Sequence, residues 1–93
     1  MALSWDERKR AETLANRQLD FSDAEKIFSG FRVEQVDDRK DYGEVRYIAI
    51  GMIDEKIIVA VWTQRLAIKR IISMRKANAN EEARYRAALD GYR

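Results

Sequence analysis

The segment VRYIAIGMIDEKIIVAVWTQRLAIKRIISM, residues 45–74, sets the architecture of the chain. It holds three stretches rich in β-branched and aromatic residues, and two short connections, residues 53–55 and 64–66, separate them. Connections of this length suit hairpins, so an antiparallel meander is expected. The predicted strands are Val45 to Met52, Lys56 to Thr63 and Ala67 to Met74.

The middle strand has an unusual pattern. Its core, Ile57 to Val61, is apolar at every position, so both alternating faces are hydrophobic. An antiparallel strand with one face in water would alternate between apolar and polar residues. We therefore expect this strand to be central and covered on both sides.

Capping patterns on either side of the meander predict helices. Ser4-Trp5-Asp6-Glu7 and Ser22-Asp23-Ala24-Glu25 both have capping-box spacing. The first predicts a short helix from Ser4 to Asn16, and the second predicts a short helix that Gly30 ends. After the meander, Asn78 or Asn80 is expected to cap a helix that runs through Leu89, with Gly91 past its end.

The remaining elements complete an α+β plan. Residues 31 to 36 alternate well enough for a further strand, and the charged turn segment DDRKDYGE, residues 37–44, follows it. The expected fold has two short N-terminal helices, a four-stranded antiparallel sheet and a C-terminal helix. Because 93 residues suffice for one modest core and no linker divides the chain, residues 1–93 are expected to form a single domain.

Cysteine and histidine are both absent from the chain. Their absence excludes a disulfide framework, thiolate catalysis, zinc sites built from those ligands and an imidazole general base. The sequence has no apolar run close to the roughly 18 residues of a membrane span and does not begin with a signal-peptide pattern. We therefore expect a cytoplasmic protein with no membrane association, no metal site and no cofactor.

Positive charge is concentrated in one part of the sequence. Eighteen Lys and Arg against sixteen Asp and Glu leave a formal net charge of +2, which by itself does not indicate a nucleic-acid binder. From Ile57 to Lys76, however, the chain has no acidic residue. Five cations lie in that stretch: Arg65, Lys69, Arg70, Arg75 and Lys76. This local basic field predicts an anionic ligand.

Four motifs taken together resemble one family of proteins. They are S-W-D at residues 4–6 with its following helix, F-S-D-A-E-K-I-F at 21–28, Y-G-E-V-R-Y-I-A-I-G at 42–51, and R-I-I-S-M-R-K-A at 70–77 with E-x-x-x-Y after it. Each motif alone is a weak signal. In this order and spacing, from Leu3 to about Tyr85, they resemble the BrnT family of bacterial toxins.

The resemblance implies a ribonuclease toxin of a type II toxin–antitoxin pair with a compact RelE-like fold. Its partner would be a BrnA-type antitoxin that carries a ribbon-helix-helix DNA-binding part. The toxin would meet operator DNA only through that antitoxin, and the complex would repress its own operon.

This chain departs from the family pattern at two places. Family members often carry K-H-G between the first two helices, where this chain has Asn16-Arg17-Gln18, so Arg17 replaces the family histidine. In the last strand the family usually reads R-I-R-I-I-S-A-R, where residues 68–75 here read I-K-R-I-I-S-M-R. A cation and an isoleucine have exchanged places, so alternation alone does not assign the faces of this strand.

Cleaving RNA without a metal requires cations that hold the charge developing on the phosphate oxygens. Arginine suits this task because its planar fork matches two phosphate oxygens and stays charged at every accessible pH. The candidate catalytic arginines are Arg46, Arg65, Arg70 and Arg75. Any one of them could instead be a solvated cation or a member of an ion pair. For Arg70 and Arg75 together, the functional interpretation is favoured.

The reaction also needs a base for the 2′-hydroxyl proton and an acid for the leaving 5′-oxygen. Lysines among arginines have lowered pKa values, which makes Lys69 or Lys76 conceivable proton-transfer groups, and Glu82 and Tyr85 are the other possibilities. Tyr85 is also at helical spacing for a core residue. The predicted catalytic set adds Lys76 and Tyr85 to the four arginines, and the predicted RNA-binding set is Arg17, Lys69 and Tyr42.

The acidic turn and the aromatic residues allow other interpretations. Asp37, Asp38 and Asp41 could hold Mg²⁺, but acidic loops are more often solvated turns, which is the interpretation adopted. Aromatics could stack on bases, with Tyr42 beside Gly43 the most exposed candidate and Trp62 more typical of packing.

Three hypotheses for function follow. The first is a metal-independent endoribonuclease toxin that inhibits growth and is neutralised by its antitoxin. The second is a catalytically weakened module, with the family histidine replaced by Arg17, that still binds the antitoxin and takes part in operon repression. The third is a nucleic-acid-binding regulator that uses the basic strand without catalysis.

Overall fold

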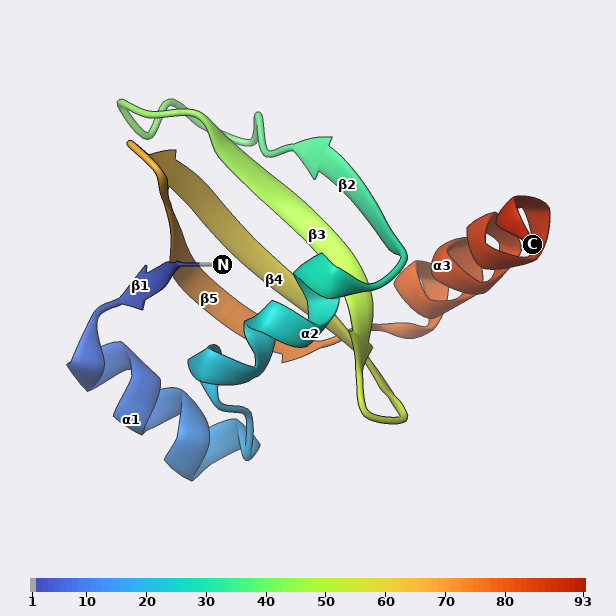
Figure 1. Ribbon diagram of the computed structural model, residues 1–93, viewed down its shortest axis with the longest axis horizontal. Coiled ribbons are helices and arrows are strands. Elements are labelled where there is room, and N and C mark those ends of the chain that lie inside the picture. Colours follow the sequence, from blue (N-terminus) through green and yellow to red (C-terminus); the bar gives the residue numbers. More distant parts are fainter. Residues whose placement is uncertain (1) are drawn as a thin grey trace.

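The predicted meander is present as three long strands in the computed structural model, which describes residues 2–93 (Figure 1). The strands are β3 (Arg46–Ile53), β4 (Lys56–Arg65) and β5 (Ile68–Lys76), each antiparallel to the next. Two-residue turns join them, and Asp54 and Leu66 begin these turns in the left-handed backbone conformation, with φ of 57° and 56°. The strand predictions are confirmed, apart from shifts of one or two residues at their ends.

Two edge strands complete the sheet, whose order is β1-β5-β4-β3-β2. β2 (Arg32–Val36) pairs antiparallel with β3, while β1 (Leu3–Trp5) pairs in parallel with residues 69–71 of β5. The α+β class is correct, but the prediction of four antiparallel strands is wrong because the sheet is mixed and has five. Three residues are too few to show the alternation that marks a strand.

Helix α1 (Glu7–Arg17) begins later than expected. Its cap is Asp6, whose carboxylate accepts the backbone N–H groups of Arg8 and Lys9 at 2.9 and 3.1 Å. The predicted cap, Ser4, lies in β1 instead. A carboxylate caps a helix as well as a hydroxyl does, so both residues of S-W-D fitted the cap position and the sequence did not distinguish them.

The second predicted helix is divided into two short pieces. A 3₁₀ turn, η1 (Phe21–Asp23), is capped by Asp20, which accepts the N–H of Ser22 at 3.0 Å. Helix α2 (Ala24–Ser29) follows and ends at Gly30, as expected. The predicted capping box at Ser22 is wrong, because the side-chain cap comes from Asp20, two residues earlier, and α2 itself has no side-chain cap.

Helix α3 (Ala79–Tyr92) begins with a full capping box. The side chain of Asn78 accepts the N–H of Glu81 at 2.8 Å, and the carboxylate of Glu81 accepts the N–H of Asn78 at 2.9 Å, which confirms the predicted cap. The helix continues through Gly91, so its predicted end at Leu89 is wrong. Glycine permits helical as well as left-handed backbone, and one glycine in a last turn weakens a helix only slightly.

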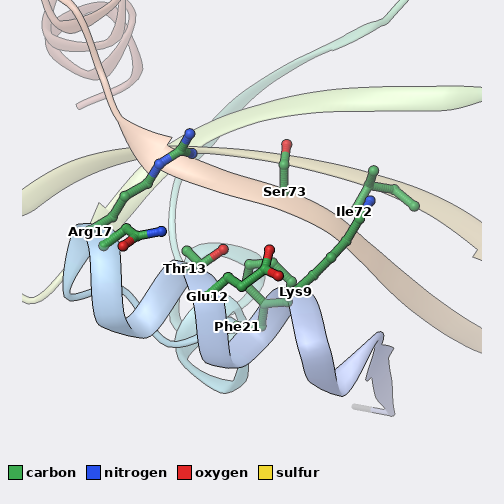
Figure 2. A pocket seen from close by; sticks show the side chains of 8 residues that line it. Lys9, Glu12, Thr13, Arg17, Phe21, Ile72 and Ser73 are labelled. Atoms are coloured by element: carbon green, nitrogen blue, oxygen red, sulfur yellow. The ribbon is translucent and has the colours of Figure 1, made fainter.

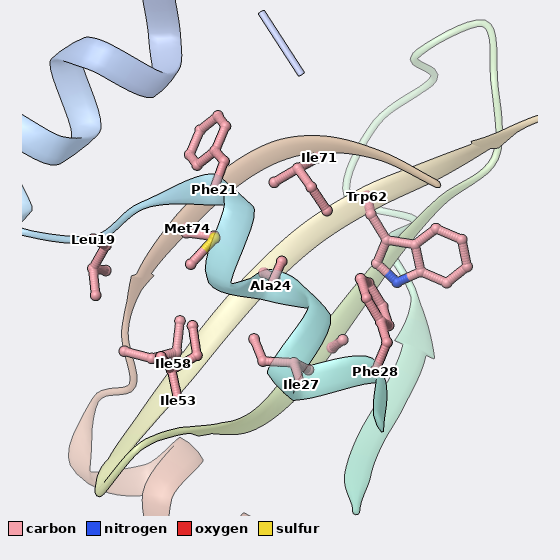
Figure 3. Packing of buried hydrophobic residues seen from close by; sticks show 12 residues of the cluster. Leu19, Phe21, Ala24, Ile27, Phe28, Ile53, Ile58, Trp62, Ile71 and Met74 are labelled. Carbon is pink, nitrogen blue, oxygen red and sulfur yellow. The ribbon is translucent and has the colours of Figure 1, made fainter. Parts of the chain in front are cut away.

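Helix α2 lies across one face of the sheet, the α2 face (Figure 1). Its side chains Ala24, Ile27 and Phe28 point towards Ile58 and Trp62 of β4 (Figure 3). This main core is completed by Leu19, Phe21, Ala49, Ile53, Ala60, Ile71 and Met74. Burying such apolar side chains is worth roughly 1.5–3 kcal/mol each, so this layer provides most of the stability of the domain.

Gly51 of β3 lies directly beneath α2. A Cβ atom at this position would be 2.8 Å from Cγ2 of Ile27, whose side chain is completely buried. The close approach of the helix to the sheet therefore depends on a residue without a side chain.

The opposite face, the α3 face, carries a smaller cluster. Tyr85 of α3 is 2% exposed and packs with Ile50, Ile57 and Val59. Strand β4 is consequently buried on both faces, which confirms the prediction for its core. The cluster occupies one end of the α3 face, and polar residues occupy the other end, where β3 begins and β4 ends.

A β-bulge sets the orientation of β5. Val61 pairs with Ser73 and Trp62 pairs with Ile71, so Ile72 has no partner on β4. An extra residue in one strand shifts the alternation of every side chain beyond it. The bulge therefore determines which residues of β5 share a face, a point that sequence alternation left open.

Candidate functional site

The bulge sorts the cations of β5 onto two faces. Arg70 pairs with Thr63 and Arg75 pairs with Val59, and both of these β4 residues belong to the α3 face. Lys69 and Lys76 pair with Gln64 and Ile58, which belong to the α2 face. The two arginines favoured from the sequence are thus brought to one surface, and the two lysines are separated from them.

One row of residues crosses the α3 face from strand to strand. Arg46, Thr63 and Arg70 are direct neighbours on β3, β4 and β5. The backbone N–H of Asp37 donates to the carbonyl of Arg46 at 2.7 Å and extends the row past the end of β2. Between the two arginines, Thr63 is buried and its hydroxyl donates to the carbonyl of Val45 at 2.7 Å.

Arg65 follows Thr63 on the same face by strand alternation, and Arg39 joins these residues from the segment after β2. We call these residues the arginine face: Arg39, Arg46, Arg65, Arg70 and Arg75. Most of its members are held by carboxylates.

Arg75 is bound by Glu81 from the first turn of α3. Both oxygens of Glu81 accept from the guanidinium, at 2.7 and 2.8 Å. The hydrogen bond from Arg75, helped by the N–H of Asn78, lowers the pKa of Glu81 to about 2, and the same bond raises the pKa of Arg75. The pair combines a fixed guanidinium with a carboxylate that is ionised at any pH near neutrality.

Arg46 and Arg65 share a single carboxylate. Glu44 accepts from Arg46 at 3.1 Å and from Arg65 at 3.3 Å, and the bond from Arg46 is the main reason that its pKa is lowered. The guanidinium of Arg46 also lies 4.2 Å from the centre of the Tyr42 ring. Two positive charges against one negative charge leave this corner of the face cationic.

Arg70 is the exception. Across residues 2–93 it makes no hydrogen bond and no ion pair, although its side chain is half-buried. Its charge is felt by Asp6, whose pKa is lowered first by the N–H of Lys9 and also by Arg70. Arg70 is therefore the cation of this face that is ready to bind an external anion.

Sequence reasoning missed Arg39 and misjudged Asp37. Asp37 was interpreted as part of a solvated turn, yet it is 5% exposed and binds Arg39 through both carboxylate oxygens, at 2.7 and 2.8 Å. Tyr42 donates its hydroxyl to the same carboxylate at 3.1 Å. The available signal was Asp-x-Arg after a strand, where an aspartate folds the chain back on itself. Tyr42 itself lies between Arg46 and Lys40, whose Nζ is 5.2 Å from the ring.

The other predicted site residues lie away from the arginine face. The hydroxyl of Tyr85 donates to the carbonyl of Phe31 at 3.2 Å, which places this side chain in the core. Nζ of Lys69 lies 4.1 Å from the Trp62 ring on the α2 face. Because a cation and an isoleucine have exchanged places at residues 68 and 69, the charged Lys69 side chain lies against the aromatic ring of Trp62. Lys76 is exposed on that face.

Arg17 binds the edge of the sheet. Its Nη1 donates to the carbonyl of Met74 at 2.8 Å, at a part of β5 that β1 does not cover. Figure 2 shows the side chain reaching from the end of α1 to β5, along one side of a shallow pocket of about 230 Å³. The hydroxyl of Ser73 points away from α1 (Figure 2). The residues that line the pocket are not members of the arginine face.

Carboxylates on this surface are tied to arginines and not to one another. In the part of the chain that the structure describes, no three acidic residues come close enough to hold a metal ion together. The arrangement can instead bind a phosphate through several guanidinium groups, with Glu81 and Glu44 as the nearby carboxylates.

Comparison with protein families identifies a family that covers most of the chain. The family model of ribonuclease toxin BrnT, of type II toxin–antitoxin systems, matches residues 5–81. The chain belongs to the BrnT family. A search of curated proteins gives no match.

Membership of the BrnT family makes this chain a ribonuclease toxin of a type II toxin–antitoxin system, and a toxin of this class has an antitoxin as its partner. The matched region includes the whole arginine face and Glu81. Within residues 2–93, none of the helices has both the length and the hydrophobicity needed to cross a bilayer.

Proposed function

We propose that this BrnT protein is a metal-independent endoribonuclease and that the arginine face is its RNA-binding and catalytic surface. The observation that carries the proposal is the gathering of Arg46, Arg70 and Arg75 on one side of the sheet, with Arg70 unpaired among the residues described. A guanidinium that has no carboxylate partner, or that shares one carboxylate with another arginine, can bind the phosphates of a polyanion such as RNA.

The chemistry required is attack of the ribose 2′-oxygen on the neighbouring phosphorus. This forms a cyclic phosphate and breaks the bond to the 5′-oxygen, while one proton leaves the 2′-hydroxyl and another joins the 5′-oxygen. In this proposal Arg70 and Arg75, which share one face of β5, hold the phosphate oxygens as charge builds on them. Fixed donors of this kind typically contribute about 100-fold or more to the rate.

Glu81 is the candidate proton acceptor. It is the carboxylate bound to Arg75, and its pKa of about 2 keeps it ionised but weakly basic. A phosphate that binds Arg75 competes with Glu81 for the same N–H groups. Loss of those hydrogen bonds raises the pKa of Glu81 towards its ordinary value, so substrate binding would itself produce a stronger base. Glu82 is not proposed for this role, because its partner is Arg86 of α3 and not a member of the arginine face.

The antitoxin is proposed to be of the BrnA type, with a ribbon-helix-helix part that contacts operator DNA on behalf of the complex. A cationic surface is a ready anchor for an acidic segment of the partner, so we expect the antitoxin to cover the arginine face. Covering Arg70 and Arg75 would block RNA directly. The toxin is proposed to act on RNA in the cytoplasm.

The test is incubation of the purified protein with RNA, with and without EDTA. We expect cleavage that survives EDTA and that is lost in Arg70→Ala, while Arg86→Ala serves as the control. Arg86 is also a partly exposed arginine, but it lies on α3, away from the arginine face, and pairs with Glu82. Strict dependence on added Mg²⁺ would overturn the metal-independent mechanism.

A protein that binds its antitoxin and represses the operon without cleaving RNA would instead be the catalytically weakened module in which Arg17 replaces the family histidine. Growth arrest on expression without the antitoxin separates the two cases, because only an active toxin predicts it.

A further inference from the structure

The segment that joins β2 to β3 (Figure 1) is organised around one buried carboxylate. The side chain of Asp37 is 1% exposed and accepts two bonds from the guanidinium of Arg39, at 2.7 and 2.8 Å, and one from the hydroxyl of Tyr42, at 3.1 Å. The bonds from Arg39, helped by the bond from Tyr42, lower the pKa of Asp37, so this carboxylate is ionised at neutral pH. A buried charge is costly unless its partners stay in place, so the hydroxyl of Tyr42 is held at a fixed point.

Asp37 and Tyr42 both contact Arg46, the first residue of β3. The backbone N–H of Asp37 donates to the carbonyl of Arg46 at 2.7 Å. The guanidinium carbon of Arg46 lies 4.2 Å from the centre of the Tyr42 ring. A guanidinium over a tyrosine ring is attracted by the electrons of that ring. The contacts therefore form a closed loop, in which the buried carboxylate holds Tyr42 and the ring of Tyr42 supports Arg46.

Arg46 is held in this way and still has donors to offer. Its Nε donates to Glu44 at 3.1 Å, which uses one of the five N–H groups of the guanidinium. Across residues 2–93 the other four, on Nη1 and Nη2, have no partner, and the side chain is 24% exposed. In Arg75, by contrast, both Nη groups donate to Glu81. The end of the Arg46 guanidinium that carries Nη1 and Nη2 is thus oriented and unoccupied.

We propose that Asp37 and Tyr42 are positioning residues, which hold the guanidinium of Arg46 ready to bind a phosphate of RNA. The identity of the anion as RNA rests on the function proposed above. A phosphate fits because the two Nη groups of a guanidinium match two of its oxygens. A long side chain that is already ordered loses less conformational entropy when it binds, so positioning strengthens binding without adding a contact. In this role Tyr42 supports an arginine, whereas the sequence suggested stacking on a nucleobase.

The positioning role is tested with RNA that cannot be cleaved, so that binding is measured apart from activity. The probe is a fluorescent 2′-O-methyl oligoribonucleotide of mixed sequence, and its anisotropy gives the affinity. We expect Arg46→Ala to weaken binding about tenfold or more, because charge-assisted hydrogen bonds to phosphate are lost. Tyr42→Leu leaves the charge and removes the supporting ring, and should weaken binding about threefold. Tyr42→Phe breaks only the bond to Asp37 and should cause a smaller loss.

The decisive comparison repeats Tyr42→Leu in protein that already carries Arg46→Ala. If Tyr42 acts through Arg46, the double variant binds RNA no more weakly than Arg46→Ala alone. A tyrosine that only stabilises the fold, or that itself stacks on a base, weakens binding by the same factor in both backgrounds. A second probe, an abasic oligonucleotide with the same number of phosphates, isolates the phosphate contact. The loss in Tyr42→Leu should be the same with this probe.

Tyr47→Leu is the matched control. Tyr47 follows Arg46 on β3, but its ring packs against Trp62 on the α2 face, with 4.7 Å between the ring centres. Its replacement should lower stability in urea titrations and leave RNA affinity unchanged. Circular dichroism checks the fold of each variant, and Tyr42→Phe remains informative if Tyr42→Leu does not fold.

The outcomes separate the positioning role from the proposed enzyme. Equal losses from Tyr42→Leu with and without Arg46, or a loss confined to the probe that carries bases, would overturn the positioning role and leave the ribonuclease proposal intact. A loss that depends on Arg46, in a protein that cleaves no RNA, would support the positioning role and overturn the enzyme. Failure of the parent protein to bind either probe would overturn the positioning role, while the cleavage assay with EDTA decides the ribonuclease proposal independently.

Discussion

Replacing Glu81 with Gln tests the ion pair that the site and the fold share. The substitution keeps an oxygen that can accept the N–H of Asn78 but removes the charge that binds Arg75. A pKa of about 2 against the ordinary 4.5 is a difference of about 2.5, or roughly 3 kcal/mol at 1.36 kcal/mol per pH unit. Because the side chain of Arg75 is 43% exposed, solvent screens part of the interaction between the two charges. We therefore expect Glu81→Gln to lower the free energy of unfolding by about 1–2 kcal/mol at pH 7.

The pH dependence has a definite sign. The pKa of Glu81 is lower in the folded protein than in the unfolded chain, so the stabilisation is complete above about pH 4.5 and disappears as the pH falls through about 2. The difference between parent and Glu81→Gln should therefore be largest near pH 7 and close to zero at pH 2. Urea denaturation is suitable because it does not add salt. A difference in free energy of unfolding that is unchanged from pH 7 to pH 2 would refute the ion-pair reasoning.

Three further substitutions test separate parts of the structure. Gly51→Ala should lower the free energy of unfolding by about 1–3 kcal/mol through its clash with Ile27, whereas Gly91→Ala, which meets open space, should not destabilise the protein; urea titrations compare them. Arg70→Ala should reduce RNA cleavage about 100-fold with little change in melting temperature, because Arg70 has no partner among the described residues to lose, and a large drop in melting temperature would mean that it is structural. Arg17→His should lose the hydrogen bond to the β5 edge and roughly 0.5–1 kcal/mol of stability, without raising cleavage; a clear gain in cleavage would show that this position transfers protons.

The three strands of the meander could be predicted from the sequence because the features that indicate them are local. Alternation, hairpin-length connections and a run of apolar residues at 57–61 each depend on neighbours along the chain, and the structure confirms them. The capping box at Asn78 is local for the same reason. Strand β1 was missed because its three residues are defined by pairing with β5, about 66 positions away in the sequence.

The site was predictable in composition and not in arrangement. The sequence identified Arg70 and Arg75 but could not place them on one face, since the bulge at Ile72 depends on pairing with β4. It included Tyr85 among the catalytic candidates, although the hydroxyl of that residue is used by Phe31. It omitted Arg39, because burial of Asp37 by a folded-back loop leaves no periodic pattern in the sequence.

The bulge at Ile72 determines whether the arginines of the proposed RNA-binding surface lie on one face of β5. In a regular strand two side chains share a side only when an even number of steps separates them, and Arg70 and Arg75 are five steps apart. The unpaired residue converts this odd spacing into an effectively even one. If Ile72 were paired in a regular ladder, the chain would keep every cation, yet one arginine would turn away from the other. The surface proposed to bind RNA therefore depends on the pairing register of β5 as much as on the chemical identity of its residues.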